Sequence, residues 1–270
     1  MLNKKIGFIG CGNMTKAIIN GIVKSQVITP ENIWVFDRKV ATNQQMSAEY
    51  GLHAAESAEV IARETDILVV AVKPNVIRKV LGDIAGQISK QTLVVSIAAG
   101  VTLDSLADIL GHDRKIIRIM PNTPALVGEG MSSVTPNALV SPEETATILE
   151  IFRSFGQAEQ VSEYLIHPVV GVSGSSPAYV FMMIEAMADA AVLGGMPRQQ
   201  AYSFAAQAVK GAAQMVLETG QHPAQLKDSV CSPGGTTIEA VQTLESQGFR
   251  SAIMLAMQKC IEKSEALSKK

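Results

Sequence analysis

Short apolar runs alternate with segments of helical period through roughly the first 160 residues, and the alternation stops near Glu163. Continuous apolar runs are typical of strands covered on both faces, and helices that join such strands arrange them in parallel. The pattern therefore predicts an α/β, doubly wound domain over residues 1–162. Its expected strands lie at residues 5–9, 33–36, 67–72, 93–97 and 116–120.

The rest of the chain contains helical patterns only. Alanine, methionine and leucine dominate there, and the first two helices are apolar around most of their circumference, which indicates burial on several sides. We therefore expect an all-α dimerisation domain over residues 163–270 that a second subunit completes; a large monomeric bundle is the alternative. At least a dimer is expected, with a larger ring as a further option. The expected helices lie at residues 178–193, 198–219, 236–246 and 249–267.

The charge balance argues against two classes of partner. Lys and Arg number 23 against 25 Asp and Glu, a net charge of −2, whereas proteins that bind nucleic acid or anionic membranes present a basic face. The longest uncharged stretch, residues 164–184, contains Pro168 and Pro177, so we interpret it as a buried turn and a core helix. We expect neither a nucleic-acid partner nor a membrane partner.

The cysteines and histidines point to the compartment and to the metal content. Cys11, Cys231 and Cys260 are odd in number and far apart, which favours a reducing compartment over a disulfide framework. The four histidines have no ligand spacing. A cytoplasmic protein without a metal site is therefore expected.

A glycine-rich turn follows the first apolar run. Gly10 allows a tight turn, and Gly12 lets the backbone approach a pyrophosphate at the start of a helix that begins with Asn13 and Met14. Cys11 fills the turn, and Thr15 replaces the third glycine of the usual pattern. The position predicts a Rossmann-like dinucleotide site; an ordinary glycine turn is the alternative.

The end of the second apolar run carries opposite charges that favour different cofactors. Asp37 would bind the ribose 2′-hydroxyl of NAD(H), whereas Arg38 and Lys39 would pair with the 2′-phosphate of NADP(H). The two interpretations compete within three residues, so both remain open from the residues alone.

Four further short segments have an unusual composition. Three of them follow the apolar runs at residues 67–72, 93–97 and 116–120, and the fourth lies at the start of the expected helix at residues 236–246. Because parallel strands end at one edge of a sheet, the first three segments should lie beside the glycine turn. The fourth segment exposes backbone N–H groups suited to a carboxylate. The residues are Ala71, Val72, Lys73 and Pro74; Ala98 and Ala99; Asn122 and Thr123; and Ser232, Gly234, Gly235, Thr236 and Thr237.

With these segments in order, the sequence resembles the pyrroline-5-carboxylate reductase family. The matching words run from Ile6 to Arg250 and include IGFIGCGNM, AVKP, SIAAG, MPNTP, SGSSPAY and LKDSVCSPGGTT. The chain departs from many relatives at Asp37, where Ser or Asn is common, and at Ala58, where Asn is common. Both departures bear on the choice of cofactor.

The resemblance implies reduction of 1-pyrroline-5-carboxylate to L-proline, with NADP(H) as the favoured cofactor and NAD(H) as the alternative. It implies that Gly10, Gly12, Asn13, Met14, Ala71, Val72, Lys73 and Ala99 bind the cofactor. The residue patterns described above add Cys11, Asp37, Arg38, Pro74, Ala98, Asn122 and Thr123 to the expected cofactor site. The resemblance also implies that Glu163, Thr236 and Thr237 contact the small-molecule substrate, and the exposed N–H groups of the same loop add Ser232, Gly234 and Gly235 to the expected substrate site.

The chemistry suggests a catalytic role for one of these residues. Thr237 would hydrogen-bond the ring nitrogen while backbone N–H groups of residues 234–237 hold the carboxylate; helix capping is the alternative role. Lys73 is expected to contact the cofactor, with general acid as its alternative. The loops near Gly12 and Gly235 are expected to share one cavity, within a chain or across subunits.

Two other functions compete with this interpretation. A β-hydroxyacid dehydrogenase shares the domain plan, but its chemistry requires a lysine early in the second domain. The chain has no lysine between Lys115 and Lys210, which argues against it. A non-catalytic NAD(P)-binding protein would have no use for a second anion-binding loop.

Overall fold

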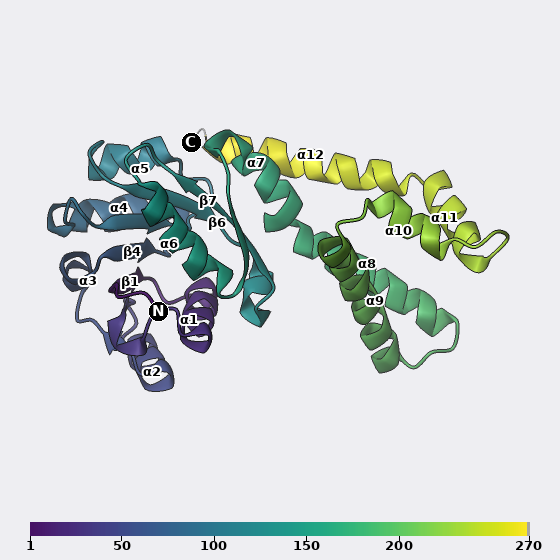
Figure 1. Cartoon of the computed structure of the whole chain (residues 1–270), viewed down its shortest axis with the longest axis horizontal. Helices are drawn as coiled ribbons and strands as arrows, with labels where there is room; N and C mark the ends of the chain where they lie inside the picture. Colours follow the sequence, from purple (N-terminus) through teal and green to yellow (C-terminus); the bar gives the residue numbers. More distant parts are fainter. Residues whose placement is uncertain (269–270) are drawn as a thin grey trace. The chain divides into compact units, whose positions relative to one another are not determined.

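The computed structural model describes residues 1–268 and divides into two compact units (Figure 1). The first unit contains Met1–Gly174 and the end of the last helix from Ile261 onward, and the second unit is Ser175–Cys260. The chain therefore passes between the units twice, after Gly174 and after Cys260.

The first unit is an eight-stranded sheet with helices on both faces. The strand order is β3-β2-β1-β4-β5-β6-β7-β8. All neighbours pair in parallel except β6 and β7. The strands are β1 (Ile6–Ile9), β2 (Ile33–Phe36), β3 (His53–Ala54), β4 (Ile67–Val70), β5 (Leu93–Ser96), β6 (Ile116–Met120), β7 (Gly130–Pro136) and β8 (Gly156–Gln160).

Six α-helices connect or follow these strands. Two of them, α4 and α6, begin on a signal that the sequence carries: Ser141 caps α6 in a capping box with Glu144, and Pro74 and Pro142 occupy first-turn positions. The helices are α1 (Asn13–Ser25), α2 (Val40–Tyr50), α3 (Ala58–Glu64), α4 (Pro74–Ile84), α5 (Leu103–Leu110) and α6 (Pro142–Arg153). Short 3-10 turns lie at η1 (Pro30–Asn32), η2 (Ala85–Gln87), η3 (Thr123–Val127) and η4 (Glu163–Leu165).

The sheet separates two apolar clusters, one on each face. One cluster joins Ile18 and Ile22 of α1 with Phe152 of α6, and the other joins Leu81 of α4 with Leu106 of α5. Apolar strands buried on both faces require this arrangement. The expected α/β doubly wound, Rossmann-like domain is thus confirmed.

Strands β7 and β8 were not expected from the sequence. Neither has an apolar run: β7 reads GMSSVTP and β8 reads GQAEQ. In β7 the side chains of Ser132, Ser133 and Thr135 are buried, and their hydroxyl groups have no hydrogen-bond partner. Small polar residues form this strand because its backbone pairs with β6 and β8, a tertiary effect that hydropathy does not reveal.

The second unit is helical. A short helix and a π-helical turn, α7 (Ile166–Val169) and η5 (Val170–Gly174), lead to it from the first unit. Its helices are α8 (Ser176–Leu193), α9 (Arg198–Thr219), α10 (Pro223–Val230), α11 (Thr236–Ser246) and most of α12 (Phe249–Ser268). The expected all-α domain is confirmed, and α10 is an element that was not expected.

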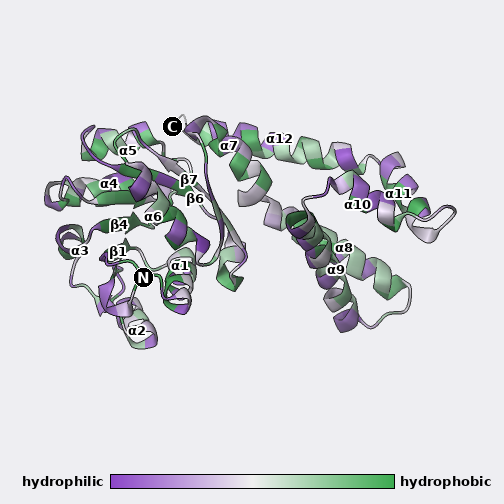
Figure 2. Ribbon diagram, viewed as in Figure 1, coloured by the Kyte–Doolittle hydropathy of each residue, from purple (hydrophilic) through white to green (hydrophobic). Residues whose placement is uncertain are grey.

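The helices of the second unit bury little within a single chain. Among the described residues of this unit only Ala188, Ala201 and Ala205 are buried, while Phe181 and Leu193 are 63% and 91% exposed. Figure 2 shows apolar residues along α8 and α9. By length and composition alone, the helical stretch Glu163–Leu193 could cross a membrane. Core helices of soluble proteins pass the same test, so this finding is weak support for a membrane span.

Candidate active site

The candidate cofactor residues follow neighbouring strands at one edge of the sheet. Strands β1, β4, β5 and β6 pair in parallel, so the segments after them meet at their common carboxyl end, where doubly wound sheets bind ligands. The structure thereby brings together residues 10–14, 71–74, 98–99 and 122–123.

The two glycines of the loop after β1 have different structural roles. Gly10 has a φ of +97°, and a Cβ there would lie 2.7 Å from the carbonyl oxygen of Ala71, so the fold itself requires glycine. Gly12 has a φ of −76°, and a Cβ there would meet nothing within 4 Å. The protein leaves the space in front of Gly12 open, as close approach of a pyrophosphate requires.

The start of α1 is suited to hold an anion at this place. No side chain caps the helix, and its first turn contains no acidic residue, so the partial positive charge of the helix N-terminus is not neutralised from within. Thr15 is fully buried and donates its hydroxyl to the carbonyl oxygen of Gly10 at 2.6 Å. The residue that replaces the third glycine thus fixes the turn from inside.

Cys11 fills the interior of the same loop. Its side chain is buried, with Sγ 4.0 Å from Oδ1 of Asn43. Burial raises the pKa of the thiol from 9.0 to about 12, and the negative charge of Asp37 adds to the rise. The thiol is therefore neutral at physiological pH and adds no negative charge to a phosphate site.

At the end of β2, the acidic and the basic side chains that could select the cofactor lie in different environments. Oδ2 of Asp37 accepts the N–H of Cys11 and Oδ1 accepts the N–H of Lys39, both at 3.0 Å. Arg38 and Lys39 are exposed. The carboxylate is therefore engaged by the protein's own backbone, while the two cations remain accessible.

The remaining residues of the edge differ in what they present. Lys73 is the N-cap of α4 and its side chain is exposed, as are Ala99 and Thr123. Ala98 is buried, and its N–H donates to Oγ of Ser96 at 3.3 Å. Lys73, Ala99 and Thr123, together with the exposed Pro74 and the half-buried Ala71 and Val72, are therefore accessible to a ligand.

Asn122 is occupied by contacts within the protein. It is buried, its Oδ1 accepts the N–H of Met131 at 2.9 Å, and its Nδ2 donates to the carbonyl oxygen of Ser173 at 3.0 Å. The side chain thus ties the loop after β6 to the start of β7 and to η5. Its contribution to the edge is to shape the turn.

Glu163, expected to contact substrate, has partners within the first unit. Its Oε1 accepts the N–H of Leu103 at 2.8 Å and Nη1 of Arg118 at 2.9 Å. The Arg118 side chain is only 5% exposed, and a buried guanidinium needs such a partner. Sequence reasoning missed this pair, although an arginine inside the apolar strand IIRIM is a signal for one.

The glycine-rich loop of the second unit ends at an uncapped helix. Gly234 has a φ of +65°, and Gly235 is the N-cap of α11 without any side-chain cap. The N–H of Gly235 already donates to the carbonyl oxygen of Ser232 at 3.0 Å. Thr237 is therefore not the capping residue; it is the second residue of the helix and half-buried.

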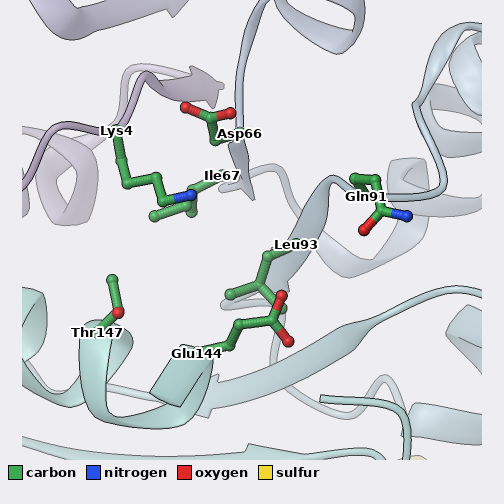
Figure 3. A pocket seen from close by; sticks show the side chains of 7 residues that line it. All are labelled: Lys4, Asp66, Ile67, Gln91, Leu93, Glu144 and Thr147. Atoms are coloured by element: carbon green, nitrogen blue, oxygen red, sulfur yellow. The ribbon is translucent and has the colours of Figure 1, made fainter. Parts of the chain in front are cut away.

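A small cavity at the other edge of the sheet contains none of the candidate residues. It measures about 180 Å³ and lies near the amino ends of β1, β4 and β5 (Figure 3). Glu144 in its wall accepts a hydrogen bond from Nζ of Lys115 at 2.7 Å and completes the capping box of α6 with Ser141. Within residues 1–268 no group of three His, Cys, Asp or Glu side chains could hold a metal ion.

The sheet, the open glycine loop and the separate helical unit define a dinucleotide-dependent oxidoreductase. Two family models match this division. The model described as "NADP oxidoreductase coenzyme F420-dependent" covers residues 5–100, and the one described as "Pyrroline-5-carboxylate reductase dimerisation" covers residues 163–267.

Full-length relatives give the family. The pyrroline-5-carboxylate reductase of Escherichia coli is 65% identical over 99% of this chain and its own full length, and that of Methanosarcina acetivorans is 46% identical over the full length of both. The chain belongs to the pyrroline-5-carboxylate reductase family, which confirms the resemblance noted above.

Solved structures agree with this assignment. The pyrroline-5-carboxylate reductase of Coxiella burnetii has a TM-score of 0.95, with 34% identity and full coverage of both chains. The Plasmodium falciparum enzyme, solved with NADP bound, has a TM-score of 0.87 at 35% identity over 99% of both chains. A 3-hydroxyisobutyrate dehydrogenase from Mycobacterium tuberculosis, 14% identical over 72% of this chain and 67% of its own, reaches 0.53 and shows a shared fold alone.

The buried thiol gives the first prediction. At pH 8, iodoacetamide should leave Cys11 unmodified in the folded protein, because the pKa of the buried thiol is about 12 and only thiolates react. The half-buried Cys231 and Cys260 serve as internal references, and peptide mass spectrometry after timed labelling measures all three. In guanidinium Cys11 should react like the others. Labelling of Cys11 as fast as that of the references in the native state would contradict this description of the loop.

Proposed function

We propose that this chain reduces 1-pyrroline-5-carboxylate to L-proline with a reduced nicotinamide dinucleotide, the last step of proline biosynthesis. The single observation that carries the proposal is the open space in front of Gly12 at the uncapped start of α1, in a chain of this family. The fold itself does not require glycine at this position, and the glycine leaves open the space where a pyrophosphate would lie.

NADP(H) is proposed as the favoured cofactor, with NAD(H) as the alternative. The residues fit such a group: the α1 start suits the pyrophosphate, and the exposed Arg38 and Lys39 suit a 2′-phosphate. Residues 10–14, 71–74, 98–99 and 122–123 would hold it. When bound, the reduced dinucleotide supplies the hydride.

The substrate requires a hydride at carbon and a proton at the ring nitrogen. The protonated imine is far more electrophilic than the neutral one, so we propose that the site binds the protonated ring and needs no strong side-chain acid. Thr237 Oγ1 would accept a hydrogen bond from the ring N–H. The N–H groups of Gly234, Thr236 and Thr237 would hold the carboxylate, because that of Gly235 is already bonded to Ser232.

Besides the substrate contact expected for it, Glu163 fits a supporting role within the first unit. Its carboxylate neutralises the buried Arg118 and accepts the N–H of Leu103 at the start of α5. We propose that it stiffens the edge of the sheet on which the cofactor would bind. Positioning of this kind can supply a large part of the rate in a two-substrate reaction.

Self-association and a cytoplasmic location are also proposed. The exposed apolar side chains of the second unit, among them Phe204 and Met254 at 68% and 71% exposure, would be buried against a second copy, giving at least a dimer. A ring of dimers is a further proposal. The free cysteines suit a reducing compartment, and partners other than the small substrate and the second copy, such as nucleic acid or membrane, are not proposed.

The reaction itself is the second prediction. The purified protein mixed with NADPH and pyrroline-5-carboxylate should oxidise NADPH, followed as loss of the nicotinamide absorbance, with L-proline as the product. A β-keto acid is the control substrate and should give no turnover. Turnover with the keto acid alone would favour a β-hydroxyacid dehydrogenase, and NADPH binding without turnover on either would indicate a binding protein; both results contradict the proposal.

Thr237 provides the third prediction. Thr237→Ala should lower kcat by about 10- to 100-fold, the effect of losing one hydrogen bond to a charged group, with NADPH affinity unchanged. Thr243→Ala is the matched control, because this exposed hydroxyl of the same helix bonds only to the carbonyl oxygen of Glu239. Steady-state kinetics and direct NADPH titration measure both variants. Unchanged turnover in Thr237→Ala would remove the residue from the mechanism.

A further inference from the structure

Asn43 is a buried amide in α2, on a helix whose neighbouring residues Gln44 and Gln45 are exposed. It is 5% exposed, and both ends of its side chain bind the backbone of Asp37. Its Oδ1 accepts the Asp37 N–H at 2.6 Å, and its Nδ2 donates to the Asp37 carbonyl oxygen at 2.9 Å. Burial of an amide is favourable only when its groups are paired in this way, so the orientation of Asn43 and that of the Asp37 backbone are fixed together.

The fixed backbone in turn directs the Asp37 carboxylate toward the glycine loop. The carboxylate accepts the N–H groups of Cys11 and Lys39, and the Gly10 N–H donates to the carbonyl oxygen of Phe36 at 2.8 Å. The turn after β1 and the turn after β2 are therefore joined by several hydrogen bonds. Asn43 lies behind this network, and no motif in the sequence singled it out.

In dinucleotide-binding sheets an acid at this place accepts the ribose 2′-hydroxyl and favours NAD(H). Here the acid is present, but both of its oxygens already accept backbone N–H groups. The next two residues, Arg38 and Lys39, are exposed cations on a turn whose backbone is held in place. An anion that carries a phosphate on the 2′-oxygen suits such a turn better than a free hydroxyl does.

We propose that Asn43 is a positioning residue that sets the cofactor preference of this chain. By holding the backbone of Asp37, it keeps the carboxylate on the glycine loop and leaves Arg38 and Lys39 to receive the 2′-phosphate of NADP(H). The inference rests on the proposed function in that a dinucleotide must bind at the carboxyl edge of the sheet. It deepens that proposal by assigning the preference to a residue that does not touch the ligand.

Calorimetric titration with NADP⁺ and with NAD⁺ tests this assignment without any turnover. In Asn43→Ala the ratio of the two affinities should shift toward NAD⁺ by about tenfold. This is the effect of losing one or two hydrogen bonds between the cationic turn and the 2′-phosphate. The released carboxylate can then reach a ribose hydroxyl, and the cationic turn loses its support. A role confined to stability would lower the melting temperature and leave the ratio unchanged.

Three further variants complete the experiment. Arg38→Ala should weaken NADP⁺ alone, and Gln44→Ala, an exposed neighbour on the same helix, should leave both affinities as they are. Asp37→Asn should weaken NADP⁺ and NAD⁺ by similar factors, because the wild-type carboxylate supports the loop instead of the ribose. If Asn43→Ala does not fold, Asp37→Asn still tests whether the Asp37 carboxylate supports the loop or contacts the ribose.

Two results would overturn the assignment. One is an unchanged affinity ratio in folded Asn43→Ala, and the other is a selective loss of NAD⁺ binding in Asp37→Asn, which would mean that Asp37 contacts the ribose. Either result leaves the proposed reductase activity standing, since that is measured with substrate. If the wild-type protein binds neither dinucleotide, the proposed function fails as well.

Discussion

The parallel pairing of β1, β4, β5 and β6 is the constraint on which the candidate cofactor site depends. Because these strands point the same way, the loops that follow them must meet at one edge. The pairing brings together side chains and N–H groups that are more than one hundred residues apart in the chain. The hydroxyl of Thr15, which donates a hydrogen bond, and the side-chain oxygens of Asp37 and Asn122, which accept backbone N–H groups, then hold individual loops in shape. The edge is thus built before any ligand arrives, which reduces the ordering that binding requires.

The second unit differs from the first in how little of its apolar surface a single chain buries. Its helices are apolar over much of their surface, yet the described part of a single chain buries little of that surface. If a second copy covers this surface, as proposed above, the unit gains stability from association, and folding and self-association would be coupled. The apolar composition of these helices is also the reason why the stretch Glu163–Leu193 is long and apolar enough to cross a membrane. Its loop at residues 232–237 adds a second uncapped helix start, of the kind suited to a carboxylate.

Much of this arrangement could be predicted from the sequence, and the failures have identifiable causes. Apolar runs predicted β1, β2, β4, β5 and β6, because burial on both faces leaves a direct signal in the sequence. Strand β7 was missed because its buried side chains are small and polar. The role of Asn43 and the Arg118–Glu163 pair were missed because a buried polar side chain is explained only by the group that it bonds, which hydropathy does not reveal. The competition between Asp37 and Arg38 could not be resolved from the sequence, since it depends on where the carboxylate points.

The substitution Gly12→Ala tests the central claim most directly, because the open space in front of Gly12 is what assigns the loop to a pyrophosphate. A Cβ there meets no protein atom within 4 Å and the φ of −76° is allowed, so stability should stay within about 1 kcal/mol of the wild type. NADPH affinity, measured by calorimetry on the same samples, should fall by about tenfold or more, the effect of displacing charge-assisted hydrogen bonds. A folded Gly12→Ala protein that binds NADPH as tightly as the wild type would contradict the account.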